Sequence, residues 1–180
     1  MRDVAVMFAD VIGSTALAAS RPPTEVVALL NAFFAQVVKV TESNGGWVNK
    51  FEGDGALCVF GTPTPLELPA RHGLRAARVL HELLARELPQ LKAGIGVSAG
   101  PAVAGNVGAE ERYEYTVIGD PVNEAARLCE LAKRRPGHLL TSAEALELAG
   151  PEERRHWQLA DQVSLRGRPE PTQVAAPLLV

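Results

Sequence analysis

Two carboxylates in this 180-residue sequence, those of Asp10 and Asp54, stand at positions where a charged side chain contributes little to the stability of a domain. Asp10 ends the apolar run from Val4 to Ala9, which is typical of a strand buried on both faces. A charge at that position is costly unless it binds a ligand or accepts hydrogen bonds. Asp54 stands between Gly53 and Gly55, and an Asp-Gly pair is by itself an ordinary turn signal. Together, the two residues are candidate ligands for a hard cation.

The predicted topology brings these two carboxylates together. Residues 47–51 and 56–60 read as a hairpin whose tip carries Asp54. When the first strand pairs with this hairpin, the end of the strand approaches the tip. Two carboxylates there make an oxygen-rich site for Mg²⁺ or Mn²⁺, which binds few carboxylates together with substrate phosphates.

A candidate phosphate-binding segment follows Asp10 directly. Val11 to Thr15 contains Gly13 and Ser14, and small residues at a helix start leave backbone N–H groups free for phosphate. The segment lacks the GK[ST] of a P-loop. The glycines of Gly94-Ile95-Gly96 lie inside a predicted strand, which argues against a dinucleotide-binding loop.

Asn123 and Arg127 are four residues apart on a predicted helix and therefore share one face. An arginine fork binds phosphoryl oxygens as negative charge develops on them, and lysine does not replace it. By themselves, the two residues also fit a solvated helix surface.

The elements that must position these residues form one predicted domain over residues 1–180, with a core at about 4–135 and a C-terminal helix and edge strands at about 136–180. The predicted strands are 4–9, 47–51, 56–60, 93–99, 102–107 and 113–118, with a turn at 100–101; the predicted helices are 24–43, 68–88, 120–133 and 142–150. Asp120 is expected to cap its helix, with Pro121 in the first turn. The order β-α-β-β-α-β predicts an α+β fold, a ferredoxin-like split βαβ sandwich with C-terminal additions. Its helices are expected on one sheet face, leaving the other open or free to meet a second copy.

The amino-acid composition limits the classes of partner that the protein can bind. Eighteen Lys and Arg against 21 Asp and Glu give a net charge of −3, which excludes a dominant basic surface for nucleic acid. The sequence has no run of about 20 apolar residues, the length that a membrane-spanning helix needs. Cys58 and Cys129 lie in apolar segments without a CxxC motif, which favours buried thiols and a reduced, cytoplasmic location. The four histidines are scattered and do not have zinc-site spacing.

Four motifs in order resemble the catalytic domain of class III nucleotidyl cyclases. They are FADVIGST (8–15), NKFEGDGAL (49–57), GIGVSAGPAVAGNVG (94–108) and YTVIGDPVNEAARL (115–128), and LRGRPEP (165–171) is similar to the family's ending. The resemblance covers nearly the whole chain.

The resemblance implies a nucleoside triphosphate substrate, a homodimer or heterodimer of two such domains, and nucleotide sites at the interface; for this chain we expect a homodimer. By position, it assigns two Mg²⁺ or Mn²⁺ ions per site to Asp10, Asp54 and the carbonyl of Val11, the triphosphate to Gly13, Ser14 and Thr15, the base to Lys50 and Thr116, and the ribose and transition state to Asn123 and Arg127. One protomer is expected to supply the metal ligands of a site and the other the base, ribose and arginine contacts. Arg166, beside Gly167, is a further candidate for the β- and γ-phosphates, as is Arg168.

The base-recognition residues favour ATP. The Lys50 ammonium only donates, which suits the adenine N1 acceptor and opposes the guanine N1–H. Thr116 departs from the commonest family pattern, which has Asp, and is similar to a subgroup often linked to bicarbonate stimulation. Because a hydroxyl both accepts and donates, we expect weaker discrimination against GTP.

Several alternatives stay open at this point. A guanylate cyclase or a dual-specificity cyclase has the same chemistry, although the former would want an acidic residue in place of Lys50. A diguanylate cyclase would be expected to have a GGDEF-like turn, whereas this sequence has Glu52-Gly53-Asp54-Gly55. A catalytically silent binding or dimerisation domain would be expected to lack one of four polar residues, namely Asp10, Asp54, Asn123 and Arg127, and all four are present. An upstream sensor or membrane segment is compatible with the sequence.

Overall fold

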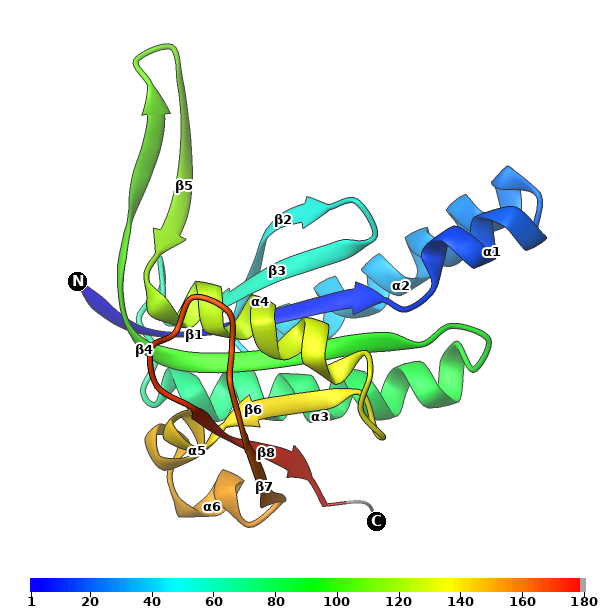
Figure 1. Ribbon diagram of the computed structural model, residues 1–180. Helices are drawn as coiled ribbons and strands as arrows, with labels where there is room; N and C mark the ends of the chain where they lie inside the picture. The colour runs from blue at the N-terminus through cyan, green and yellow to red at the C-terminus, as the bar shows by residue number, and fades with distance from the viewer. Residues whose placement is uncertain (179–180) are drawn as a thin grey trace.

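The computed structural model describes residues 1–178 and has a mixed sheet covered by helices (Figure 1). Its strands are β1 (Arg2–Val11), β2 (Trp47–Glu52), β3 (Gly55–Phe60), β4 (Ala93–Ala109), β5 (Arg112–Ile118), β6 (Leu139–Ser142), β7 (Trp157–Val163) and β8 (Thr172–Pro177). Its helices are α1 (Ser14–Ser20), α2 (Pro23–Ser43), α3 (Pro69–Glu87), α4 (Asp120–Ala132), α5 (Ala143–Ala149) and α6 (Pro151–Arg154). The predicted α+β class is confirmed.

Strand β1 lies inside the sheet, between β3 and β4. The strand order is β2-β3-β1-β4-β6-β8-β7, with β5 paired to β4, and among the described residues only β4 and β6 pair in parallel. At the end of β1, Asp10 pairs with Gly55 of β3 and Gly94 of β4. The predicted approach of Asp10 to the hairpin tip therefore follows from the register of β1 and β3.

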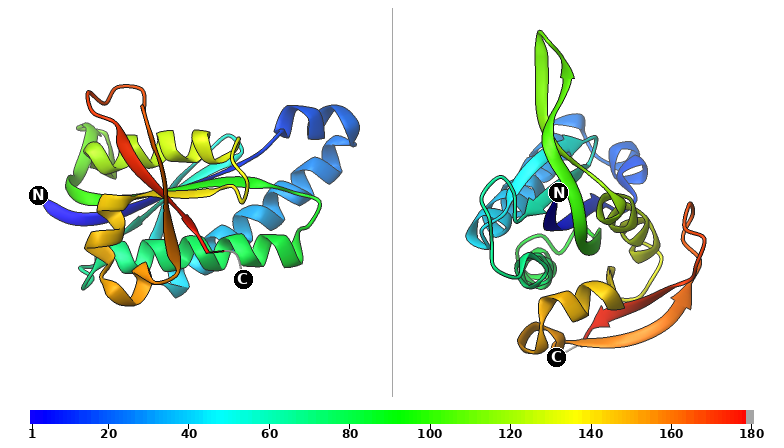
Figure 2. Two further views of the ribbon diagram at one scale, coloured as in Figure 1. Left: turned by 60° about the horizontal axis from the view of Figure 1, so that its bottom comes forward. Right: turned by 90° about the vertical axis from the view of Figure 1, so that its left-hand side faces the viewer.

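The helices cover both faces of the sheet, which corrects the prediction of one helical face. On one face, Met7 of β1 packs in a core with Phe33 of α2 and Leu74 of α3. On the other, Val6 packs in a second cluster with Ala125 of α4. Successive strand residues point to opposite faces, so a strand that is apolar throughout needs cover on both. Figure 2 shows α4 across the sheet from α2 and α3.

Two glycines of β4 let α4 lie directly on the sheet. A Cβ on Gly96 would come within 2.2 Å of the backbone nitrogen of Cys129, and one on Gly94 within 2.5 Å of Lys133 Cγ. No larger residue fits without moving the helix. This close approach sets the position of every side chain on α4.

Strand β4 is longer than predicted. The expected turn at Gly100-Pro101 does not occur, because β4 pairs with β1 up to Ala102 and then continues into a hairpin with β5. The hairpin projects well beyond the rest of the sheet (Figure 1). Its exposed apolar side chains are Val103, Val107, Tyr113 and Ile118.

The C-terminal part adds β6, which the sequence analysis missed, and the pair β7–β8. Edge strands were expected in the tail at 163–180, whereas β7 begins at Trp157. The loop between β7 and β8 returns toward α4. Leu165 in this loop is buried with Leu128 and Ala132 of α4. This contact places the neighbouring arginines of the loop beside α4.

Among the described residues, α2 is the one helix long and apolar enough to cross a membrane by length and composition. Phe33, Val37 and Val40 of this helix are buried in the protein core. A core helix passes such a test as readily as a membrane span does. The prediction of two buried, unpaired thiols is confirmed for Cys58 and Cys129.

Candidate active site

Asp10 lies at the end of β1 with half of its carboxylate unpartnered. Glycines flank it on both neighbouring strands, and a Cβ on Gly55 would approach Oδ1 to 3.1 Å. Oδ1 is buried and has no hydrogen-bond partner. Burial raises the pKa of Asp10, and the nearby Asp54 carboxylate acts in the same direction. An orphaned carboxylate oxygen beside a second carboxylate fits the donor set of a hard divalent cation.

Asp54 is held against β1 by its backbone. The Val11 N–H donates to the Asp54 carbonyl at 3.2 Å, which ties the β2–β3 turn to the end of β1. Burial by itself would raise the pKa of Asp54, but the nearby Ser14 hydroxyl and Asp10 carboxyl favour its charged form and lower the pKa. The structure therefore brings Asp10, Asp54 and Ser14 together. Within residues 1–178, no three His, Cys, Asp or Glu side chains are placed so that together they could hold a metal ion, which leaves Asp10 and Asp54 as the paired acidic ligands.

Lys133 at the end of α4 was missed by the sequence analysis. Its Nζ lies 2.6 Å from Asp10 Oδ2 and 2.7 Å from Glu130 Oε1. Burial would lower the pKa of Lys133, but these hydrogen bonds raise it above its usual value. The Gly94 and Gly96 pair was the available signal, because glycines inside a strand indicate close backbone approach.

The candidate phosphate segment lies beside the two carboxylates. Gly13 precedes α1 with φ of +70°, a left-handed conformation that glycine adopts without strain. Ser14 and Thr15 form the first turn of α1. The Val11 carbonyl belongs to the last residue of β1. The six residues predicted to bind the metals and the triphosphate, namely Asp10, Val11, Gly13, Ser14, Thr15 and Asp54, thus lie together at the end of β1.

The two candidate base-recognition residues lie on strands joined by a hydrogen bond. Asn49 Nδ2 donates to the Tyr115 carbonyl at 3.0 Å, linking β2 to β5. Lys50 follows Asn49 and Thr116 follows Tyr115. Lys50 is exposed, with Nζ 2.8 Å from Glu52 Oε1, so donors remain for a ligand.

A third group lines a cavity of about 150 Å³ between α4 and the β7–β8 loop. Its walls include Asn123, Arg127 and Arg166, the three residues expected to meet ribose and phosphates. The structure records no ion pair for either of these two arginines within residues 1–178. Arg127 also lines a neighbouring cavity of about 180 Å³ that contains Asp10 and Glu52.

Arg168 in the same loop does not face this cavity as a free cation. Its Nη1 lies 2.5 Å from Glu124 Oε1 and 3.0 Å from Asp120 Oδ2. Glu124 is only 4% exposed and also accepts a hydrogen bond from the Ser98 hydroxyl. Asp120 is the first residue of α4 and not its cap, which is Gly119, so the capping prediction is wrong. Asp120 and Glu124 instead hold Arg168.

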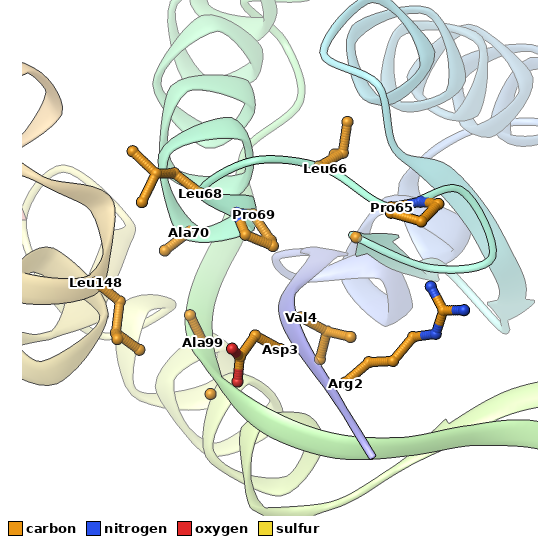
Figure 3. A pocket seen from close by; sticks show the side chains of 12 residues that line it. Arg2, Asp3, Val4, Pro65, Leu66, Leu68, Pro69, Ala70, Ala99 and Leu148 are labelled. Atoms are coloured by element: carbon orange, nitrogen blue, oxygen red, sulfur yellow. The ribbon is translucent and has the colours of Figure 1, made fainter.

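A cavity of about 380 Å³ lies at the opposite end of β1. Arg2, Asp3 and Val4 line it together with the segment before α3, as Figure 3 shows. None of the predicted site residues contributes to it. The predicted chemistry therefore gathers around α4 and the Asp10 end of β1.

Comparisons with known proteins agree with this arrangement. The family model of the adenylate and guanylate cyclase catalytic domain matches residues 1–175. Two uncharacterized proteins of Mycobacterium tuberculosis are 56% identical over 177 residues and 52% identical over 176 residues, each covering 98% of this chain. The chain spans about a third of the length of these curated relatives, 33% in both cases.

Solved structures of both base specificities are similar. The adenylyl cyclase CyaB from P. aeruginosa has a TM-score of 0.87 at 25% identity, covering 99% of this chain and 95% of its own. The guanylyl cyclase Cya2 has a TM-score of 0.77 at 28% identity, covering 97% of this chain and 90% of its own.

Proposed function

The chain belongs to the adenylate and guanylate cyclase catalytic domain family, and we propose that it is an adenylate cyclase, converting ATP to 3′,5′-cyclic AMP and pyrophosphate. In this reaction, the ribose 3′-oxygen forms a bond to the α-phosphorus, and the bond from that phosphorus to the β-phosphate oxygen breaks. The 3′-hydroxyl proton leaves to solvent, and pyrophosphate departs.

The preference for ATP rests on Lys50 and Thr116. The Asn49–Tyr115 hydrogen bond ties together the strands that carry them, which supports a shared role at one base edge. A lysine ammonium donates to adenine N1, and the threonine hydroxyl accepts from the N6 amine. Guanine offers an N1–H donor to the same lysine, so its binding leaves two donors facing each other. This is the observation that carries the choice of ATP.

The metal-binding role is assigned to Asp10 and Asp54, with the Val11 carbonyl as a further oxygen donor. The buried Asp10 Oδ1 without a partner supports it, because such an oxygen is costly until a ligand engages it. Two Mg²⁺ or Mn²⁺ ions bound there would supply Lewis-acid activation of the 3′-hydroxyl and charge neutralisation at the phosphates.

The remaining residues bind and orient the nucleotide. Gly13, Ser14 and Thr15 offer backbone N–H groups to the triphosphate, and Asn123 orients the ribose. Arg127 lacks an ion pair in residues 1–178, so its guanidinium is available for the charge that develops on the phosphoryl oxygens. Arg166 on the same cavity reaches the β- and γ-phosphates.

We propose that the site is completed by a second copy of this chain, with one protomer supplying the carboxylates and the other the base, ribose and arginine contacts. The β4–β5 hairpin, which projects from the sheet (Figure 1), supports a homodimer, because four large apolar side chains on it are exposed. The proposal also includes a cytoplasmic location and bicarbonate stimulation. A sensor or membrane segment is proposed for the whole protein, because the curated relatives are about three times as long as the shared region.

Product analysis tests the function. The purified protein is incubated with ATP or GTP, each with Mg²⁺ or Mn²⁺, over a dilution series. We expect cyclic AMP as the main product and a specific activity that falls on dilution as dimers dissociate. Equal or greater cyclic GMP formation would contradict the preference for ATP but not the cyclase reaction. If neither product formed under any condition, the domain would be catalytically silent.

The Lys50→Glu variant tests the base assignment separately. We expect the ratio of ATP to GTP activity to fall at least about tenfold, because a carboxylate accepts from guanine N1–H and repels adenine N1. Glu52→Gln is the matched control, because it removes the ion-pair partner of Lys50 while keeping the lysine. An unchanged ratio in Lys50→Glu would remove this residue from base recognition.

A further inference from the structure

We propose that Lys133 is an internal counter-ion that holds Asp10 in the metal-free domain and competes with a divalent cation for its carboxylate. The inference rests on the metal-binding role proposed for Asp10. It adds a residue that neither the motifs nor the carboxylate geometry assigns to the site.

The contact divides the Asp10 carboxylate into two halves. Oδ2 accepts from Lys133 Nζ at 2.6 Å, while the buried Oδ1 has no partner. The side chains of Lys133 and Asp10 are only 20% and 24% exposed, so solvent screens the pair weakly. A divalent cation bound to Asp10 would meet the ammonium across one carboxylate, and the two positive charges would repel each other.

The placement of Lys133 is built into the packing of α4. Its stem runs over Gly94, where a Cβ would come within 2.5 Å of Lys133 Cγ. Gly94 is also the residue paired with Asp10 across the β1–β4 ladder. The absence of a side chain on Gly94 thus opens the path by which the ammonium reaches the carboxylate.

Glu130 gives the ammonium a second partner. Its carboxylate lies 2.7 Å from Lys133 Nζ and its side chain is 58% exposed, one turn earlier on α4. When a cation takes Asp10, Lys133 can keep its bond to Glu130 and turn toward solvent. Lys133 therefore has one position that blocks Asp10 and another that releases it.

Mn²⁺ binding without nucleotide tests the competition. Wild type, Lys133→Met, Arg134→Met and Asp10→Asn are titrated with Mn²⁺ at one pH, with free Mn²⁺ followed by electron paramagnetic resonance and the Tm followed in parallel. Arg134 is the matched control, since it is the next residue, is exposed and has no ion pair in the described part of the chain.

We expect Lys133→Met to bind Mn²⁺ at least about fivefold more tightly than wild type, the smallest effect typical of coupled binding. Its Tm without metal should be lower, because Asp10 loses its cation, and its rise with Mn²⁺ should be larger. Arg134→Met should behave like wild type, and Asp10→Asn should lose the site. Lys133→Gln, which keeps a donor without the charge, carries the same test if the methionine variant does not fold.

Two results would overturn the proposal in distinguishable ways. If Asp10-dependent binding occurs but Lys133→Met and Lys133→Gln bind Mn²⁺ no more tightly than wild type, Lys133 does not compete, and the metal role of Asp10 stands. If Asp10→Asn binds Mn²⁺ as wild type does, the metal assignment fails and the inference fails with it.

Discussion

The end of β1 and the cavity beside α4 both hold partly buried ion pairs, but the pairs involve residues with different expected roles. At the end of β1, the counter-ion Lys133 sits on Asp10, the residue expected to do the chemistry. Beside α4, Arg168 takes the two carboxylates, and Arg127 is left without an ion pair in residues 1–178. At the end of β1, the contact between Lys133 and Asp10 has to separate before a cation binds. Beside α4, the Arg127 guanidinium stays available for the substrate. The carboxylate end is thus the part that we expect metal to rearrange.

The largest expected effect comes from removing the functional group of either region. Asp10→Asn and Arg127→Met should each lower cyclase activity by about 100-fold or more, as loss of one electrostatic contact in a transition state does. Steady-state cyclic AMP formation with Mn²⁺ measures it, with far-UV circular dichroism as a check of folding. Activity within about threefold of wild type would remove that residue from the chemistry.

Arg168 should matter more for stability than its neighbour in the loop. Arg168→Met leaves the buried Glu124 without its cation, so we expect the free energy of unfolding to fall by about 3 kcal/mol. The control Arg166→Met should change it by less than about 0.5 kcal/mol, because that side chain is exposed. Urea unfolding measures both.

The double variant Arg168→Met with Glu124→Gln sharpens this result. Neutralising Glu124 should recover part of the stability, because the cost arises from an unpaired buried charge. Equal free energies of unfolding for Arg168→Met and Arg166→Met would show that the ion pairs of Arg168 do not stabilise the fold.

Mixing variants tests whether the two regions of different chains form one site. Equal amounts of Asp10→Ala and Arg127→Ala chains should recover about one quarter of wild-type activity, because half of the dimers would carry one intact site out of two. Activity after mixing and re-equilibration measures it. Recovery no greater than that of either variant alone would contradict the shared site.

The smallest effect is expected at Glu130. Glu130→Gln removes the exposed partner of Lys133 and leaves Asp10, so the free energy of unfolding should change by less than about 0.5 kcal/mol. Thermal unfolding without metal measures it, compared with Lys133→Met. A larger loss than in Lys133→Met would make Glu130 the main partner of Lys133.

Much of the fold was predictable because its signals are local. The apolar run before Asp10, the glycines around Asp54 and the spacing of Asn123 and Arg127 each depend on a few neighbouring residues. Such patterns correctly predicted most strands and helices. They failed at Gly100, where pairing with β1 up to Ala102 and with β5 from Val103 onward carried β4 through an expected turn.

The contacts that organise the candidate site join residues far apart in the chain. Lys133 and Asp10 are 123 residues apart, and Asn49 and Tyr115 are 66 apart. Sequence periodicity does not link such positions, because the distance between them depends on how closely α4 packs on β4 and on how the β4–β5 hairpin lies against β2. Arg166 and Arg168 look equivalent in the sequence, and only the packing of Leu165 on α4 and the burial of Glu124 separate them.

The sequence by itself therefore determined the residue types, their order and the family chemistry they resemble, since these depend on composition and short spacing. The tertiary structure decided which charges meet: Lys133 on Asp10, and Arg168 on Glu124. The physical reason is that the strength of a charge pair depends on separation and burial, and both are set only when distant segments pack together.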